Sequence, residues 1–292
     1  MDGESCRGGI SLKKLSPYIL LLPCSLFLII TLGFGVIEGI LQSLGFMPSL
    51  GMEEVTFKYY TELFKDGEFI KSLLFSLKTS LISSILSVII GVFIAYILYK
   101  RKSRLNNLII KLPMVIPHIV VVFIILSIFS QGGYISRIMN NLFMISDFNE
   151  FPLLINDQYG IGIVLAYLWK EIPFVAIITY DILNNINKDL IIAAKNLGAN
   201  KGQIFSKILL PLSKKSIITS FLIIFAFSFG AFEVPYLLGP TMPKALPVKA
   251  FIEYSSSDLF NRPYAMAINT VLSFISLVIM VFYEISFRKT LK

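Results

Sequence analysis

The sequence has little charge, and this shortage excludes an ordinary soluble domain. Charged residues make up 15% of the 292-residue chain, against roughly 25% in typical soluble domains. Hydrophobic residues make up 55%, and the mean hydropathy is +0.77. The two cysteines, Cys6 and Cys24, are too few for a disulfide framework. We therefore predict an integral membrane protein.

Residues for catalysis are also scarce. No glycine-rich run ends in Lys followed by Ser or Thr, so the loop whose amides cradle nucleotide phosphates is missing. The only histidine is His118, whereas a zinc protease motif needs two, and a Ser or Cys nucleophile needs a positioned base. We expect no enzyme activity, no catalytic residue, no metal site and no cofactor bound by this chain.

Long apolar runs dominate what is present. Crossing about 30 Å of hydrocarbon takes about 20 apolar residues in a helix, and six segments satisfy this. They predict an all-α membrane protein, with helices kinked at internal prolines such as Pro113, Pro117 and Pro173. The predicted spans are 17–40, 72–99, 108–130, 160–182, 216–239 and 264–287.

Basic residues gather in short gaps between these spans. The net charge of +8 therefore indicates membrane topology, with lipid as a partner, and not nucleic-acid binding. Most Lys and Arg fall in the segments that share a side with the amino terminus, which predicts that both termini are cytoplasmic.

The spans divide the chain into four parts. We expect a cytoplasmic segment over 1–16, a first transmembrane helix with an external loop over 17–71, a transmembrane core over 72–287 and a cytoplasmic tail over 288–292. In the external loop, Phe57, Tyr60, Leu63 and Phe64 have the spacing of an amphipathic helix. The core contains a cytoplasmic loop over 183–215.

Within that loop, residues 189–211 predict two short helices joined at a glycine. Asp189 is expected to cap the first helix and Gly198 to end it in a left-handed conformation. Asn200 is expected to cap the second helix, which Pro211 should stop. We predict that this segment docks on another protein.

Three ionisable residues lie deep in predicted spans: Lys170, Glu171 and Glu233. A charge at such a depth costs at least about 3 kcal/mol, so these side chains should face the bundle interior or a wet cavity. Gly230 and Pro235 bracket Glu233 and predict an interrupted helix there. Two interpretations stay open: a solute path, or an ionic bridge from Lys170 to Glu171 or Glu233 between the fourth and fifth spans.

The docking loop resembles the conserved cytoplasmic loop of permease subunits of binding-protein-dependent ABC importers. That pattern is Glu-Ala-Ala, three residues, Gly, nine residues, Ile, one residue, Leu-Pro. The matching positions are Ala193, Ala194, Gly198, Ile208, Leu210 and Pro211, and Ala199 and Phe205 also fit family preferences. The departure is Ile192 in place of Glu. Counted from Asp189 as cap, Ile192 is the third helical position, so a capping box is lost and an ionic contact is in doubt.

The resemblance implies the type I ABC importer permease fold in a prokaryotic inner membrane. It implies that a separate ABC ATPase, which binds the ATP, docks on this loop. It also implies a second permease subunit, identical or homologous, and an extracytoplasmic solute-binding protein. The runs FGAFEVPYLLGP and ALPVKAFIEY are similar to permeases for spermidine/putrescine and ferric iron. We expect a small solute such as a polyamine; iron, thiamine or phosphonate-type anions, or a secondary transporter, are the alternatives.

Overall fold

The computed structural model describes residues 12–101 and 109–290, and these are helical with no β-strand among them. Among the described residues, six helices are long and apolar enough to cross a membrane, which confirms the predicted number of spans and the all-α fold class. They are Leu20–Ser43, Gly67–Arg101, His118–Asn141, Ile161–Asn185, Lys201–Gly230 and Leu259–Val281.

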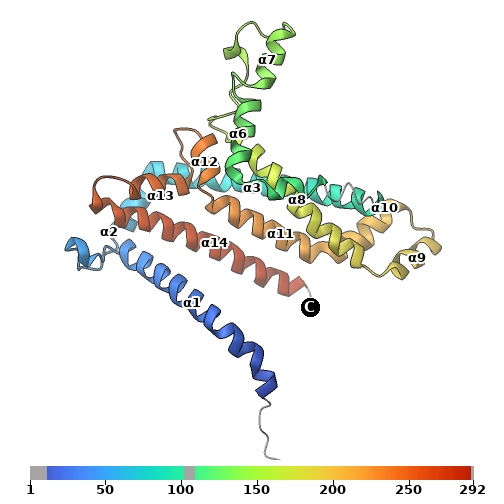
Figure 1. Ribbon diagram of the computed structural model, residues 1–292, viewed down its shortest axis with the longest axis horizontal. Helices are drawn as coiled ribbons and strands as arrows, with labels where there is room; N and C mark the ends of the chain where they lie inside the picture. The colour runs from blue at the N-terminus through green and yellow to red at the C-terminus, as the bar shows by residue number, and fades with distance from the viewer. Residues whose placement is uncertain (1–11, 102–108, 291–292) are drawn as a thin grey trace, which may run out of the picture.

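Four long helices form the body of the molecule: α3 (Gly67–Arg101), α8 (Ile161–Asn185), α11 (Leu210–Gly230) and α14 (Arg262–Thr290). They run side by side in Figure 1, whereas α1 (Leu12–Ser43) contacts α14 and then diverges from it. The short helices α9 (Lys188–Asn196) and α10 (Lys201–Ile204) lie at one end of this bundle. At the opposite end lie α2 (Lys58–Lys65) and α13 (Leu246–Tyr254).

The tightest helix pair is α3 with α8, because small residues of α3 line the contact. Ser87, Gly91 and Ala95 recur every four residues and are buried. A Cβ atom on Gly91 would lie 2.8 Å from the Cβ atom of Val175 and 3.0 Å from the carbonyl oxygen of Ile172. Glycine therefore allows the two backbones to approach closely, as small residues do in membrane bundles.

The third span is broken near its prolines, as predicted. A short helix α5 (Leu112–Val115) ends before Ile116, which is extended with φ −71° and ψ 128°, the conformation favoured before proline. Pro117 then caps α6 (His118–Phe129), and α7 (Tyr134–Asn141) follows a turn. The predicted start of this span at residue 108 lies outside the described residues. Helices α6 and α7 extend away from the bundle (Figure 1).

The fifth span differs from its predicted range of 216–239. Helix α11 ends at Gly230, and α12 (Glu233–Leu238) begins after a break at Ala231 and Phe232. The interruption predicted next to Glu233 is therefore confirmed, and the helix of this span begins before the predicted residue 216. The amphipathic helix predicted between the first two spans is also confirmed as α2, which buries Leu63 and leaves Phe64 and its N-cap residue Phe57 exposed.

A polar cluster of Asp66, Lys249 and Tyr264 ties three elements together at the α2 and α13 end. Asp66 Oδ1 accepts the Glu68 N–H at 2.8 Å at the start of α3, and its Oδ2 accepts from Lys249 Nζ at 2.5 Å and from the Tyr264 hydroxyl at 2.8 Å. Burial raises the pKa of Asp66, but the hydrogen bonds from Lys249, Tyr264 and the Glu68 backbone outweigh it and leave that pKa below its ordinary value. The carboxylate is therefore held ionised.

Candidate functional site

The docking segment is capped two residues earlier than predicted, so that it spans residues 188–211 in the structure. Asn187 is the N-cap of α9, and its side chain accepts the Asp189 N–H at 2.9 Å. Asp189 lies in the first turn, so its predicted capping role was wrong: the Asn187 backbone is non-helical and its amide oxygen reaches the N–H two residues on. Ile192 is consequently the fifth helical residue, and a Glu there would not complete a capping box.

The turn between the two helices has the predicted chemistry. Gly198 has φ +82°, the left-handed conformation that glycine adopts without strain. Its N–H donates to the Lys195 carbonyl at 2.9 Å, and the Ala199 N–H donates to the Ala194 carbonyl at 3.0 Å, which is a Schellman ending. Asn200 and Gln203 then cap α10 reciprocally. These local hydrogen bonds fix the angle between α9 and α10.

Pro211 does not stop the second helix. A π-helical turn over Phe205–Leu209 joins α10 to α11, and Pro211 lies in the first turn of α11. Proline lacks an N–H and crowds the carbonyl four residues earlier, and a wider turn relieves this conflict. The second helix of the docking segment therefore continues into α11 without a break.

The eight predicted docking residues do not share one surface. Ala194, Ala199 and Phe205 pack against buried Ala95, Leu183, Ile204 and Leu209 at the inner side of the segment. Ala193, Gly198, Leu210 and Pro211 are exposed, and Ile208 lines a cleft of about 370 Å³ with Ala194, Gly198 and Ala199. The most exposed apolar residue of the segment is Leu197, at 89%. The sequence argument missed Leu197, although its place directly before the helix-ending glycine marked it as a loop tip.

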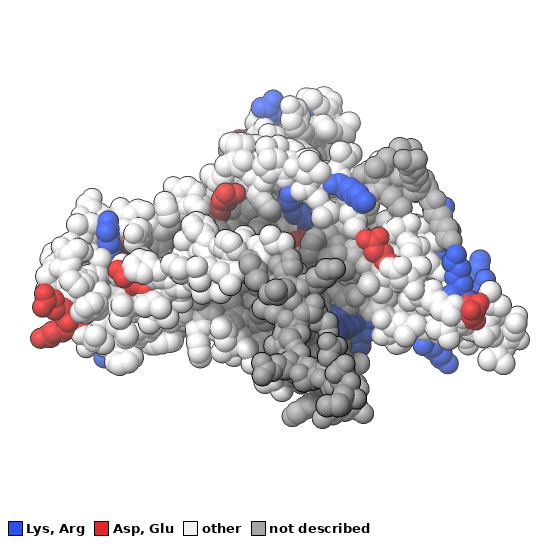
Figure 2. Space-filling view, turned by 60° about the horizontal axis from the view of Figure 1, so that its bottom comes forward, with Lys and Arg blue, Asp and Glu red and all other residues white. Residues whose placement is uncertain are grey.

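Basic side chains surround this segment. Figure 2 shows Lys and Arg gathered at the right-hand end of the molecule, over the end that carries α9 and α10. Lys188, Lys195, Lys201 and Lys207 belong to the segment itself. A partner that docks here meets an apolar tip within a positively charged surface.

A second candidate site is a cavity of about 260 Å³ between α6, α8 and α11, and two of the three predicted path residues line it. These are Lys170 and Glu171. His118 also lines the cavity, and its ring lies 5.0 Å from the Phe227 ring, centroid to centroid. The sequence argument used His118 only to exclude catalysis. The remaining lining residues are apolar or aromatic: Met114, Tyr167, Phe174, Ile223, Ile224 and Phe227.

Lys170 closes the break in the third span. Its ammonium donates to the carbonyls of Met114 at 3.1 Å and Ile116 at 2.5 Å. Because α5 stops before Pro117, these carbonyls lose the helical N–H partners that a continuous helix would supply. Lys170 therefore satisfies backbone groups that the two prolines leave unpaired.

Glu171 has a different environment from its neighbour. It is 4% exposed, one carboxyl oxygen accepts from the Ser87 hydroxyl at 3.0 Å, and Oε1 has no hydrogen-bond partner among the described residues. No ion pair in the described part of the chain joins Lys170 to Glu171 or Glu233, so the ionic bridge is not formed in this structure. Glu233 is exposed at the start of α12 and does not line the cavity.

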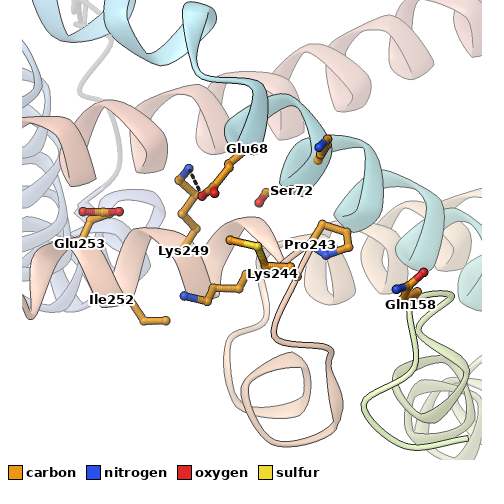
Figure 3. A pocket seen from close by; sticks show the side chains of 10 residues that line it. Glu68, Ser72, Gln158, Pro243, Lys244, Lys249, Ile252 and Glu253 are labelled. Atoms are coloured by element: carbon orange, nitrogen blue, oxygen red, sulfur yellow. Dashed lines mark ion pairs between the residues drawn. The ribbon is translucent and has the colours of Figure 1, made fainter. Parts of the chain in front are cut away.

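A third cavity, of about 270 Å³, lies beside the Asp66 cluster. Figure 3 shows Glu68 and Ser72 of α3 facing Lys249, Ile252 and Glu253 of α13, with Pro243 and Lys244 on the preceding loop. Lys249 is 3.8 Å from Glu68 in addition to its contact with Asp66. Since both signs of charge occur in the wall, the cavity has no clear preference for one ion.

The helical bundle, the broken spans and the exposed docking segment are typical of a membrane transport component. A comparison of the sequence with protein families gives the same class. The profile of the family described as "Binding-protein-dependent transport system inner membrane component" matches residues 87–292, so the chain belongs to this family.

The names of the relatives mention different solutes. The chain is 25% identical over 169 residues to a probable molybdenum ABC transporter permease protein of Haloferax volcanii, which covers 57% of each chain. It is 29% identical over 152 residues to the spermidine/putrescine transport system permease protein of Haemophilus influenzae, covering 51% of this chain and 52% of that protein. The match thus spans little more than half the length of these relatives.

A solved structure supports the fold over nearly the whole chain. It is described as a bacterial ABC transporter involved in the import of the acidic polysaccharide alginate. The TM-score is 0.79 at 19% identity, covering 96% of this chain and 99% of that one. At this identity the likeness establishes the fold, which is that of a type I ABC importer permease.

Proposed function

We propose that the chain is the permease subunit of an ATP-driven importer, and that it forms half of a small-solute pathway with a second permease subunit, identical or homologous. An extracytoplasmic binding protein delivers the solute, and separate ABC ATPase subunits bind the ATP. The observation that carries this proposal is the docking segment: an exposed, capped pair of helices at one end of a bundle whose family is binding-protein-dependent. Its basic surroundings support a cytoplasmic location for the segment and for both termini.

Docking can be tested by replacing Gly198 with tryptophan. The new side chain meets no atom within 4 Å of the Cβ position inside the chain, so its effects are strain at φ +82° and a bulky group on the docking surface. We expect the ATPase to lose co-purification with the permease and uptake to fall. Gly51→Trp is a matched control, because Gly51 also has a positive φ, +73°, and open space.

Two outcomes would contradict the docking proposal. One is ATPase co-purification and uptake that are the same for Gly198→Trp as for the control. The other is transport by the chain alone, driven by an ion gradient without any ATPase, which would instead identify a secondary transporter.

For the solute, the proposed path runs past the cavity and includes Lys170, Glu171 and Glu233. A polyamine is supported by the unpartnered oxygen of Glu171 and by the rings of Tyr167, Phe174 and Phe227, which together suit an ammonium group with an alkyl chain. The ammonium of Lys170 already donates hydrogen bonds to two backbone carbonyls. The spermidine/putrescine relative agrees with this choice.

An anion is the second candidate, because Lys170 and His118 line the same cavity and another relative is named for molybdenum. Iron, thiamine and phosphonates remain in the comparison. The reconstituted transporter should be assayed for uptake of spermidine, molybdate, a phosphonate, thiamine and ferric salts. Polyamine uptake that Glu171→Gln reduces would support the first candidate, and uptake of an anion alone would overturn it.

A further inference from the structure

We propose that Tyr96 holds the docking segment to α3, so that the segment, α3 and α8 move as one body and carry the Glu171 wall of the cavity with them. This inference rests on the proposed function and assigns Tyr96 as a positioning residue for coupling. The sequence pattern of the docking segment does not include α3 at all, because the segment lies between the fourth and fifth spans.

The contact between Tyr96 and the docking segment has two parts, and a neighbour on α3 adds a third contact to the Tyr96 ring. The ring of Tyr96 lies 4.3 Å from the ring of Phe205, centroid to centroid, at 39°. The Tyr96 hydroxyl donates to the Lys201 carbonyl at 3.2 Å. Lys100, one turn further along α3, places its ammonium 4.0 Å from the Tyr96 ring centre. Phe205 is therefore turned toward α3 and is not an exposed anchor for an ATPase.

The surrounding packing makes this contact part of a core. Ala95 next to Tyr96 is fully buried against Leu183 of α8, and Ile204 and Leu209 of the docking segment complete the cluster. By contrast, the covalent link from α8 to α9 passes through Ile186 and Asn187, which are both non-helical. A short non-helical link transmits displacement poorly, whereas a packed core moves with its helices.

From Tyr96 the connection continues along α3 to the cavity. Ser87 lies nine residues earlier on the same unbroken helix, which is about 13 Å at the rise of an α-helix. Gly91, between them, brings α3 against Val175 of α8, and the Ser87 hydroxyl bonds Glu171 at 3.0 Å. A displacement imposed on the docking segment is therefore delivered to the carboxyl group that lines the cavity.

The test uses the complete transporter, reconstituted with its ATPase, second permease subunit and binding protein. Tyr96→Leu removes the ring, Tyr96→Phe keeps it, and Phe93→Leu is the control, since Phe93 lies on the same helix and is 62% exposed. Solute uptake per ATP hydrolysed is expected to fall at least about five-fold in Tyr96→Leu and to stay within about two-fold in the other two variants. ATPase co-purification should be unchanged in all three.

The outcomes separate this inference from the proposed function. Normal uptake per ATP in Tyr96→Leu, or an equal loss in Phe93→Leu, overturns the role of Tyr96 while the importer proposal stands. A wild-type complex that neither binds the ATPase nor takes up solute in response to ATP overturns both.

A cross-link covers the case in which Tyr96→Leu fails to assemble. Cysteines at positions 96 and 205, in a chain with Cys6→Ser and Cys24→Ser, are joined by a short bifunctional maleimide. Without the cross-linker this double variant lacks the Tyr96 ring and should show the same reduced uptake per ATP as Tyr96→Leu. If the docking segment and α3 move together, the cross-link restores uptake per ATP. Uptake that stays low, or falls further, once the cross-link has formed shows that joining the two elements does not restore coupling and overturns the proposal.

Discussion

Replacing Asp66 by alanine should lower the thermal stability of the purified protein, because one carboxylate serves three partners. The change removes the cap of α3, worth about 1 kcal/mol. It also leaves the ammonium of Lys249, a residue only 7% exposed, without its nearest anion. Removing one partner of a fully buried pair costs about 3 to 5 kcal/mol.

The expected cost lies below that range for two structural reasons. The Asp66 side chain is 28% exposed, and Glu68 remains 3.8 Å from the Lys249 ammonium. We therefore assign about 2 kcal/mol to the lost pair and about 3 kcal/mol in all with the cap. For a chain of this length, about 2 °C per kcal/mol gives a fall of about 6 °C in apparent Tm.

The assay is thermal unfolding in detergent, with a double-mutant cycle as control. In Asp66→Asn the amide oxygen can still accept the Glu68 N–H and keep the cap, so only the roughly 2 kcal/mol assigned to the pair should be lost, about two thirds of the effect of Asp66→Ala. Asp66→Ala combined with Lys249→Met should be more stable than Asp66→Ala alone, because no unpaired buried charge remains. The reasoning is refuted if Asp66→Ala melts with the wild type, or if the double variant loses the full sum of the two single effects.

The pH dependence of this stabilisation follows from the lowered pKa of Asp66. A carboxyl group with a lowered pKa in the folded state contributes stability that is present above its unfolded pKa, near about 3.9, and is lost as pH falls through its folded pKa. The Tm gap between wild type and Asp66→Asn should stay constant from about pH 8 to pH 5 and narrow only below about pH 4. A gap that closes near neutral pH would contradict this assignment.

Three further changes test other contacts. Lys170→Met leaves the Met114 and Ile116 carbonyls unpaired and should cost about 2 kcal/mol, seen as a lower Tm; an unchanged Tm would show that water replaces the ammonium. Glu233→Gln, at an exposed position, should change stability by less than about 0.5 kcal/mol, so reduced uptake at normal Tm would support a path role and normal uptake would oppose it. Gly91→Ala should force α3 and α8 apart at a cost of about 1 to 3 kcal/mol, whereas Gly33→Ala, with nothing within 4 Å, should be neutral; equal Tm values would contradict the close approach.

Hydropathy determined the number of spans, because a helix in hydrocarbon needs about 20 apolar residues whatever its neighbours are. Local chemistry determined the turn at Gly198 and the cap at Asn200, since each depends on hydrogen bonds within a few residues. The same reasoning failed at Asp189, where Asn187 two residues earlier caps the helix instead. Competing caps that are this close cannot be ranked by residue type alone.

Only the tertiary structure decided how the deep polar residues are used. Lys170 and Glu171 are adjacent in sequence, yet one closes the break beside Pro117 and the other bonds Ser87. The sequence predicted that Phe205 is a docking residue, but its ring packs on Tyr96, which lies over a hundred positions earlier in the chain. Sequence spacing fixes which side chains share a helix face, whereas the partner across that face depends on which helices become neighbours. The composition thus determined a six-span membrane protein with a capped docking segment, and the packing of α3 against α8 determined what that segment can move.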